Sequence, residues 1–192
     1  YVYMVGQLAR FNDFEVLPKI IDVFVENHTA YQISEYPDGI SVQQYIKKNG
    51  GRILIDEALD VIKPILNTLK IIHDNGIYYG DFSLDNIYIT TSGHIKLSGF
   101  KPNLELREMV EQGVKADIYG VCKALYKMIT GQSPIRGYID EDRGYSNDYD
   151  LIRPKRFGIN ISQQIEDVLM KGLSSHQNER YKSAYELYDK LF

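Results

Sequence analysis

The stretch from residue 79 to residue 100, YGDFSLDNIYITTSGHIKLSGF, constrains the fold of this chain more than any other. Residues 87–89 and 95–97 are short and rich in β-branched side chains, and the turn sequence between them predicts a β-hairpin. Asp81 and Asn86 stand five residues apart in the loop before this hairpin. Because Asp and Asn side chains bind nearby backbone groups well, we expect this loop to keep one defined shape.

An earlier hairpin is predicted near the start of the chain. Residues 20–25 and 30–34 are rich in β-branched and aromatic side chains, and residues 26–29, ENHT, supply the turn between them. Residues 1–11 have apolar side chains at helical spacing and are expected to be the end of a helix.

The remaining elements are expected to be helices. The longest is predicted to start at an N-cap on Asp56, to end near Asn75 and to kink or restart at Pro64. Its apolar residues are spaced to form one buried face. Further helices are predicted from Ser41 to Lys48, over residues 116–130, after Ser162, and after a capping box formed by Ser183 and Glu186.

The composition is that of one globular domain with a sizeable core. The chain has 192 residues, of which 44% are hydrophobic and 25% are charged. The net charge of −4 without a basic stripe argues against nucleic-acid binding. Cys122 is the single cysteine, so an internal disulfide is excluded, and it is expected to be buried. The four histidines lie far apart in sequence, so no metal site is expected.

The order of these motifs resembles that of protein kinases, and most closely that of bacterial serine/threonine kinases. Asp81 and Asn86 match the base and the metal-binding Asn of the H-R-D-x-x-x-x-N loop. Residues 34–37 match the gatekeeper and hinge, and residues 117–120, DIYG, match a helix whose Asp braces that loop. Residues 178–181, NERY, match a segment with a buried structural Arg. The resemblance covers nearly the whole chain.

The resemblance implies an α+β, protein kinase-like fold. Residues 1–36 would be the remnant of a small lobe, with the end of one helix, two strands and the hinge. Residues 37–192 would form the mainly helical large lobe.

The chain departs from the family pattern where the metal ion is held. Phe100 matches the Phe of the D-F-G motif, which places Gly99 at the position of the metal-binding Asp. A glycine cannot ligate a cation. Tyr79 and Gly80 replace His and Arg in the catalytic loop, and Met4 falls near the position of the helix Glu that pairs with the ATP-binding Lys.

Several residues are expected to have structural roles through the same resemblance. Tyr79 would pack on Phe100, and Asp117 would brace the catalytic-type loop. Glu105 follows Phe100 so closely that a substrate-presenting activation segment has no room. We expect Glu105 to form a buried ion pair with Arg180, whose rupture would cost about 3–5 kcal/mol.

A nucleotide, if bound, would meet a small set of residues. Glu35 and Pro37 would lie at the hinge, and Asn86 and Tyr88 would line the cleft. Asp81 would occupy the position of the base as a vestige. No residue is expected to be catalytic, and none is expected to bind a metal ion. For Asp81 and Asn86 the alternative is that they only shape the loop.

These expectations indicate a pseudokinase that acts as a binding, scaffolding or regulatory module without ordinary phosphoryl transfer. The alternative is a kinase-like, ATP-binding enzyme with weak or altered transferase activity, completed by a small lobe outside this chain. A third hypothesis is a receptor for a small ligand at the same cleft. No cofactor is expected under the first hypothesis, whereas the second requires ATP and Mg²⁺.

The expected partner is a protein or a neighbouring domain. The acidic, tyrosine-rich residues 137–149 are either part of such a surface or a solvated loop. The location is expected to be cytoplasmic, because no apolar run approaches the roughly 18 residues of a membrane span. The chain opens at Tyr1 without an initiator Met, so it is expected to be a piece of a longer protein and a membrane link stays open.

Overall fold

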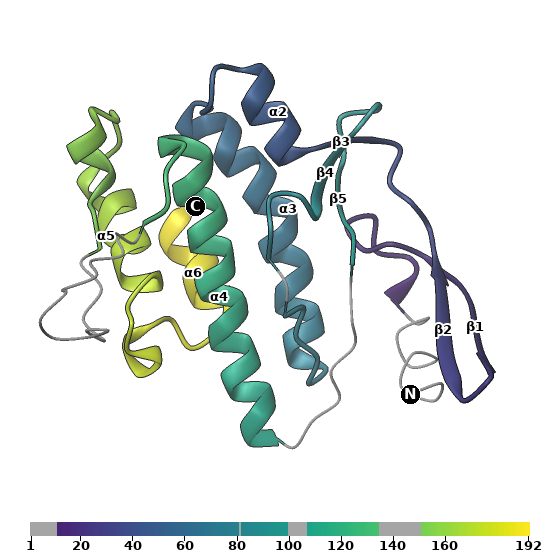
Figure 1. Cartoon of the computed structure of the whole chain (residues 1–192). Coiled ribbons are helices and arrows are strands. Elements are labelled where there is room, and N and C mark those ends of the chain that lie inside the picture. The colour runs from purple at the N-terminus through teal and green to yellow at the C-terminus, as the bar shows by residue number, and fades with distance from the viewer. Residues whose placement is uncertain (1–10, 81, 100–106, 135–150) are drawn as a thin grey trace, which may run out of the picture.

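A computed structural model describes residues 11–80, 82–99, 107–134 and 151–192 of this chain, and the side chains of residues 107–109 lie outside the description. A β-hairpin lies on one side of the molecule and a helical body on the other, with a small sheet between them (Figure 1). The predicted helix at residues 1–11 falls almost wholly outside the described residues.

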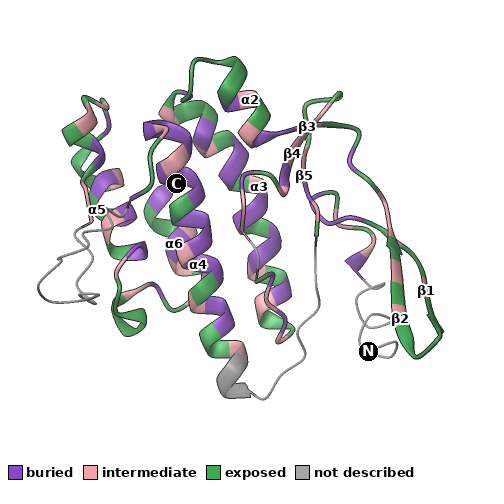
Figure 2. Cartoon of the chain, in the orientation of Figure 1, coloured by how far each residue is buried: buried purple, intermediate pink, exposed green. Residues whose placement is uncertain are grey.

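The first hairpin is formed by β1 (Ile20–Glu26) and β2 (Thr29–Ser34), which confirms the predicted pair of strands. The strands are antiparallel, with Phe24 opposite Tyr31. Asn27 and His28 make the turn in the left-handed region, at φ 48° and 57°. Such a turn suits the right-handed twist of the two strands. Much of the hairpin is exposed (Figure 2).

The second sheet has three antiparallel strands in the order β3 (Gly39–Ser41), β4 (Ile87–Thr90) and β5 (Ile95–Leu97). The hairpin of β4 and β5 confirms the prediction, whereas β3 was not predicted. Gly39 fits this edge because a Cβ atom there would lie 2.1 Å from the carbonyl oxygen of Ile89. The close approach of the two backbones therefore requires glycine.

Helix α2 (Val42–Lys48) begins at the predicted cap. The Ser41 hydroxyl accepts from the backbone N–H of Gln44 at 3.2 Å, and the Gln44 side chain accepts from the N–H of Ser41 at 3.1 Å. The two bonds form a reciprocal capping box.

Helix α3 (Ile55–Asp74) begins after Leu54, so the predicted N-cap at Asp56 is wrong. The Glu57 carboxylate accepts from the N–H of Leu54 at 3.2 Å. This side chain, and not that of Asp56, therefore satisfies a backbone donor at the start of the helix. The helix also runs through Pro64 as one element without restarting. The lost bond at a proline is local, and the helix is held by a wholly buried apolar face. That face comprises Ile62, Ile65, Leu66, Leu69 and Ile72.

Helix α4 (Arg107–Thr130) starts nine residues before the predicted residue 116. It packs against α3, and α6 (Ala184–Leu191) packs against both α3 and α4. α5 (Gln163–Gly172) contacts α4 and α6, and two short 3₁₀ turns, η2 (Pro154–Phe157) and η3 (Gln177–Glu179), connect these elements. The buried side chains gather where these helices meet (Figure 2).

The last two helices begin at the predicted serines. Ser162 accepts from the N–H of Ile165 at 3.1 Å, and Ser183 accepts from the N–H of Glu186 at 3.1 Å. The Glu186 carboxylate reaches back to the N–H of Lys182, at 2.8 Å, one residue before the expected donor. The predicted capping box of α6 is therefore correct at its serine and displaced by one residue at its glutamate.

Cys122 is buried in α4, as predicted. A Cβ atom on Gly172 would lie 2.2 Å from its Sγ atom, so glycine allows α5 to approach α4 closely here. Burial raises the pKa of the Cys122 thiol to about 12, which leaves it protonated and unreactive at neutral pH. None of the helices in the described part of the chain is both long and apolar enough to cross a membrane.

Candidate functional site

The loop that connects α3 to β4 is held in place by Asp117 of α4. One carboxylate oxygen of Asp117 accepts from the N–H of Tyr79, and the other accepts from the N–H of Gly80, both at 2.7 Å. Asp117 is almost wholly buried, at 1% exposure. Hydrogen bonds to a buried carboxylate are short and strong, so these two bonds set the position of the loop backbone.

His73, at the end of α3, is a third partner of Asp117 that sequence reasoning missed. Its Nε2 atom lies 2.9 Å from the carboxylate oxygen that also binds Tyr79. Since a carboxylate only accepts, Nε2 is the donor. No pattern links residues 73 and 117, which are 44 positions apart.

The face of α4 that meets this loop has glycines on both sides of Asp117. A Cβ atom on Gly113 would lie 2.2 Å from the Tyr78 ring, and one on Gly120 would lie 2.6 Å from the Cβ atom of Phe82. Positions 113, 117 and 120 share one face because they follow the helical repeat. The two glycines therefore give the loop aromatics room to lie against the helix.

Tyr79 is buried at the centre of this loop, at 1% exposure. Its ring lies against Phe82 with 4.6 Å between ring centroids, and its hydroxyl donates to the carbonyl oxygen of Ser98. Phe100, its expected partner, lies outside the described residues, as does Asp81. Tyr79 thus links the loop to the residue that immediately precedes Gly99.

Gly99 lies beside Asn86. The carbonyl oxygen of Asn86 accepts from the N–H of Ser98 at 2.8 Å, which sets the two segments side by side. A Cβ atom on Gly99 would lie 3.6–3.8 Å from the Asn86 side-chain amide. A side chain at position 99 would therefore point toward Asn86 at ordinary contact distance. Gly99 has φ +72°, a conformation that favours glycine but that Asp and Asn also adopt.

The expected hinge residue Glu35 binds Lys96 of β5. The Lys96 ammonium lies 2.7 Å from the Glu35 carboxylate, and the backbone N–H of Glu35 donates to the carbonyl oxygen of Lys19 at 2.8 Å. The hydrogen bond from Lys96 holds the pKa of Glu35 below its usual range. Pro37, the next expected contact, is buried. The carboxylate and the backbone N–H of Glu35 are thus both bound within the protein.

Tyr88 of β4 lies between the hinge and Ser98. Its hydroxyl is 3.4 Å from the hydroxyl of Tyr36, and the two rings meet edge to face with 5.9 Å between centroids. The pKa of Tyr88 is raised, first by the hydrogen bond with Tyr36 and then by burial, while a hydrogen bond with Ser98 acts in the opposite direction. The Tyr88 side chain therefore touches the hinge on one side and the residue before Gly99 on the other.

A sequence comparison decides the family of this chain. The protein kinase domain matches residues 6–109, which is more than half of the chain. The chain belongs to the protein kinase family.

Relatives within this family include bacterial serine/threonine kinases. The chain is 26% identical to the probable serine/threonine-protein kinase PknB of Lactococcus lactis, an alignment covering 88% of this chain and 30% of that protein. It is 24% identical to the serine/threonine-protein kinase PrkC of Bacillus subtilis, over 95% of this chain and 32% of that protein. The chain thus spans about a third of the length of these relatives.

A solved structure shares the fold. The structure described as the PpkA-294 apo form superposes with a TM-score of 0.70 at 20% identity, covering 100% of this chain and 74% of that one. The expected protein kinase-like fold, with helices and small antiparallel sheets, is confirmed, and so is the resemblance to bacterial serine/threonine kinases.

The predicted pair of Glu105 and Arg180 stays a prediction, because Glu105 lies outside the described residues. Arg180 has other partners in the structure. Its guanidinium donates to the carbonyl oxygen of Ser174 at 2.8 Å and of Lys115 at 3.3 Å, and it lies 4.5 Å from the centre of the Tyr119 ring. Arg180 thus ties the segment before α6 to α4.

Proposed function

We propose that this chain is a pseudokinase domain that acts as a binding or scaffolding module without ordinary phosphoryl transfer. The observation that supports this most directly is Gly99 beside Asn86. In kinases the Asp at that position and the Asn together hold the Mg²⁺ ions that neutralise the transferred phosphate. Gly99 provides no ligand, so the metal-dependent part of the reaction loses a main contact.

The contacts of Tyr88 also favour this function. In the family, the adenine ring of ATP lies next to the hinge. Here Tyr88 contacts the hinge residue Tyr36, and Glu35 is bound to Lys96. A nucleotide would have to displace the Tyr36–Tyr88 contact to reach the hinge backbone. The cost of displacing this contact would lower nucleotide affinity.

The alternative is a weak or altered transferase completed by further chain. The support for it is the loop held by Asp117, which keeps the backbone around Tyr79 and Gly80 fixed. Phosphoryl transfer depends largely on such positioning. The matched relatives are also named serine/threonine kinases. This alternative requires ATP and Mg²⁺ to bind together.

Thermal unfolding of this chain, and of a longer form of the protein that includes the small lobe, separates the two functions when it is measured with and without ATP and Mg²⁺. A ligand at 100 times its dissociation constant stabilises the native state by about 2.7 kcal/mol, a readily measured shift. We expect no Mg²⁺-dependent shift in either protein. A shift that disappears in Asn86→Ala would support the enzyme instead.

A further inference from the structure

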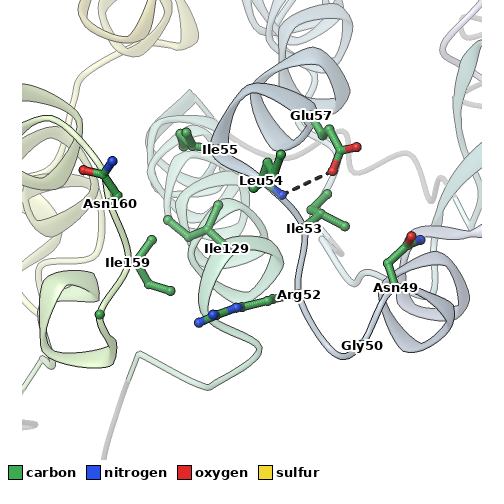
Figure 3. Close-up of a pocket in the computed structure, with 11 residues that line it drawn as sticks. Asn49, Gly50, Arg52, Ile53, Leu54, Ile55, Glu57, Ile129, Ile159 and Asn160 are labelled. Atoms are coloured by element: carbon green, nitrogen blue, oxygen red, sulfur yellow. Dashed lines mark hydrogen bonds between the residues drawn. The ribbon is translucent and has the colours of Figure 1, made fainter.

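A pocket of about 490 Å³ lies on the helical body, lined by the α2–α3 connection, the end of α4 and the segment before α5 (Figure 3). Its volume is in the range of ligand-binding pockets. Ile53 and Ile129 belong to the buried core at this pocket, whereas Leu54 is 72% exposed. Five of the eleven lining residues are aliphatic: Ile53, Leu54, Ile55, Ile129 and Ile159.

The wall formed by the α2–α3 connection is fixed to α4 by backbone contacts. The N–H of Ile53 donates to the carbonyl oxygen of Met128 at 2.9 Å. A Cβ atom on Gly131 would lie 2.5 Å from the carbonyl oxygen of Gly51, so the connection rests directly on the end of α4. The pocket is therefore preformed, which lowers the entropic cost of binding.

Arg52 provides a positive charge at this pocket. Figure 3 shows its side chain running below Ile129 toward Ile159. Lys47 and Lys48, in the last turn of α2, are exposed just before the pocket lining. These three cations form no ion pair with any residue in the described part of the chain.

The pocket lining holds one carboxylate, that of Glu57, as well as the cation Arg52. The Glu57 carboxylate accepts from the N–H of Leu54 at 3.2 Å. Arg52, by contrast, forms no ion pair with any described residue, so its guanidinium is the charged group of the lining that can bind a ligand. The electrostatic complement of Arg52 is an anionic group.

Two asparagines lie at the pocket, and a peptide suits them better than a lipid does. The Asn49 amide nitrogen donates to the carbonyl oxygen of Tyr45 at 2.8 Å, which leaves its oxygen to accept. Asn160, on the opposite wall in Figure 3, is exposed and has both a donor and an acceptor. A peptide backbone offers matching N–H and C=O groups, whereas a fatty acid chain offers none.

We propose that this pocket docks a short peptide segment of a protein partner, with an aliphatic side chain among the isoleucines and an acidic side chain on Arg52. The inference rests on the proposed scaffolding function and names the chemistry of the partner. The isoleucine-lined surface provides the apolar contact, and the guanidinium of Arg52 provides a bidentate contact with a carboxylate.

The test is an NMR titration of the full chain with N-acetylated, C-amidated Leu-Leu-Asp. We expect saturable shifts of the backbone amides in residues 49–57 and 158–160. Replacing the peptide aspartate by asparagine, or the protein residue by Arg52→Glu, is expected to weaken binding about tenfold or more, because each removes a charge-assisted hydrogen bond. Lys182→Glu, an equal change of sign at an exposed position away from the pocket, is expected to leave binding unchanged.

Three outcomes would overturn the proposal: no saturable shift at millimolar peptide, equal affinity for the aspartate and asparagine peptides, or tighter binding of decanoate than of peptide. Ile159→Ser serves as a second variant that removes apolar contact without changing charge, and it is expected to weaken binding. Thermal unfolding of each variant checks that it is folded. The nucleotide experiment is independent, so a failure of docking leaves the proposed pseudokinase function to its own test.

Discussion

At the scale of single residues, the fit between α4 and the loop before β4 depends on glycine. We expect Gly120→Ala to destabilise the protein, because the added Cβ would meet the Cβ atom of Phe82, which cannot rotate away. Overpacking costs about 1–3 kcal/mol, partly offset by about 1 kcal/mol of helix propensity. Gln112→Ala, at an exposed position of the same helix, is the matched control and should change stability by less than about 0.5 kcal/mol. Urea unfolding measures the stability of both variants. A Gly120→Ala protein as stable as the wild type would contradict the close packing.

The Glu35–Lys96 pair gives a second expectation at this scale. The pKa of Glu35 is lowered in the folded state, so the pair stabilises the protein at pH above the usual value of 4.5. This stabilisation is lost as the pH falls through the lowered folded-state value and the carboxylate is protonated. Because Glu35 is partly exposed, we expect Lys96→Met to cost at most about 1 kcal/mol at pH 7.

The measurement is urea unfolding of wild type and Lys96→Met at pH 7 and at pH 3. The difference between the two proteins should shrink at the lower pH. Lys63→Met, a lysine of α3 outside this pair, serves as the control. A difference that stays the same at both pH values would show that Lys96 stabilises by packing alone.

At the scale of elements, the segment around η2 is held to α5 by a buried carboxylate. Glu166 is 2% exposed and accepts from the N–H of Lys155 at 3.1 Å and from the Arg153 guanidinium at 3.2 Å. Asp167 is exposed and binds the same guanidinium at 3.0 Å. We expect Glu166→Gln to cost about 1–3 kcal/mol, because the buried side chain at position 166 loses the charge that strengthens its hydrogen bonds. Asp167→Asn should cost less than Glu166→Gln, because Asp167 is exposed and its pairing is screened by solvent. Thermal unfolding that ranks the two variants in the opposite order would contradict this assignment.

Sequence patterns located most of these elements because their signals are local. The turn of the first hairpin and the serine caps of α2, α5 and α6 were identified correctly, since each depends on residues within a few positions. The start of α4 was missed, although Val110 and Val114 stand at helical spacing from Ile118 and extend its apolar stripe toward the N-terminus. Residues 107–116, REMVEQGVKA, are also rich in strong helix formers, and propensity would have extended the helix.

The contacts that build the candidate site were harder to predict, because they join distant positions. The resemblance predicted that Asp117 braces the loop, and in the structure Asp117 accepts hydrogen bonds from Tyr79 and Gly80. The bond from His73 and the contact of Tyr36 with Tyr88 join residues 44 and 52 positions apart. Such pairs leave no periodic signal in one sequence and depend on the packed fold.

At the scale of the whole molecule, the helical body and the first hairpin differ in how much apolar surface they bury. Residues Ile21, Val25 and Ile33 of the hairpin are 68%, 60% and 45% exposed, whereas the central side chains of α3 are wholly buried. Regions with little buried apolar surface open at a lower free energy than the core.

We therefore expect amides of β1 and β2 to exchange with solvent faster than those of α3 and α4. Hydrogen-exchange mass spectrometry at neutral pH measures this, and the slowest amides should report global unfolding. Equal protection of the hairpin and of α3 would contradict the contrast in burial.

The absence of a metal ligand at position 99 is tested most directly by Mn²⁺, which replaces Mg²⁺ and reports its own binding. The measurement is the water-proton relaxation rate of a solution of Mn²⁺ and ATP, with and without this chain or a longer form of the protein that includes the small lobe. The proposed function predicts that neither protein changes the rate, because Gly99 offers no ligand beside Asn86. An enhanced rate that depends on ATP and disappears in Asn86→Ala would contradict it and would show a working metal–nucleotide site.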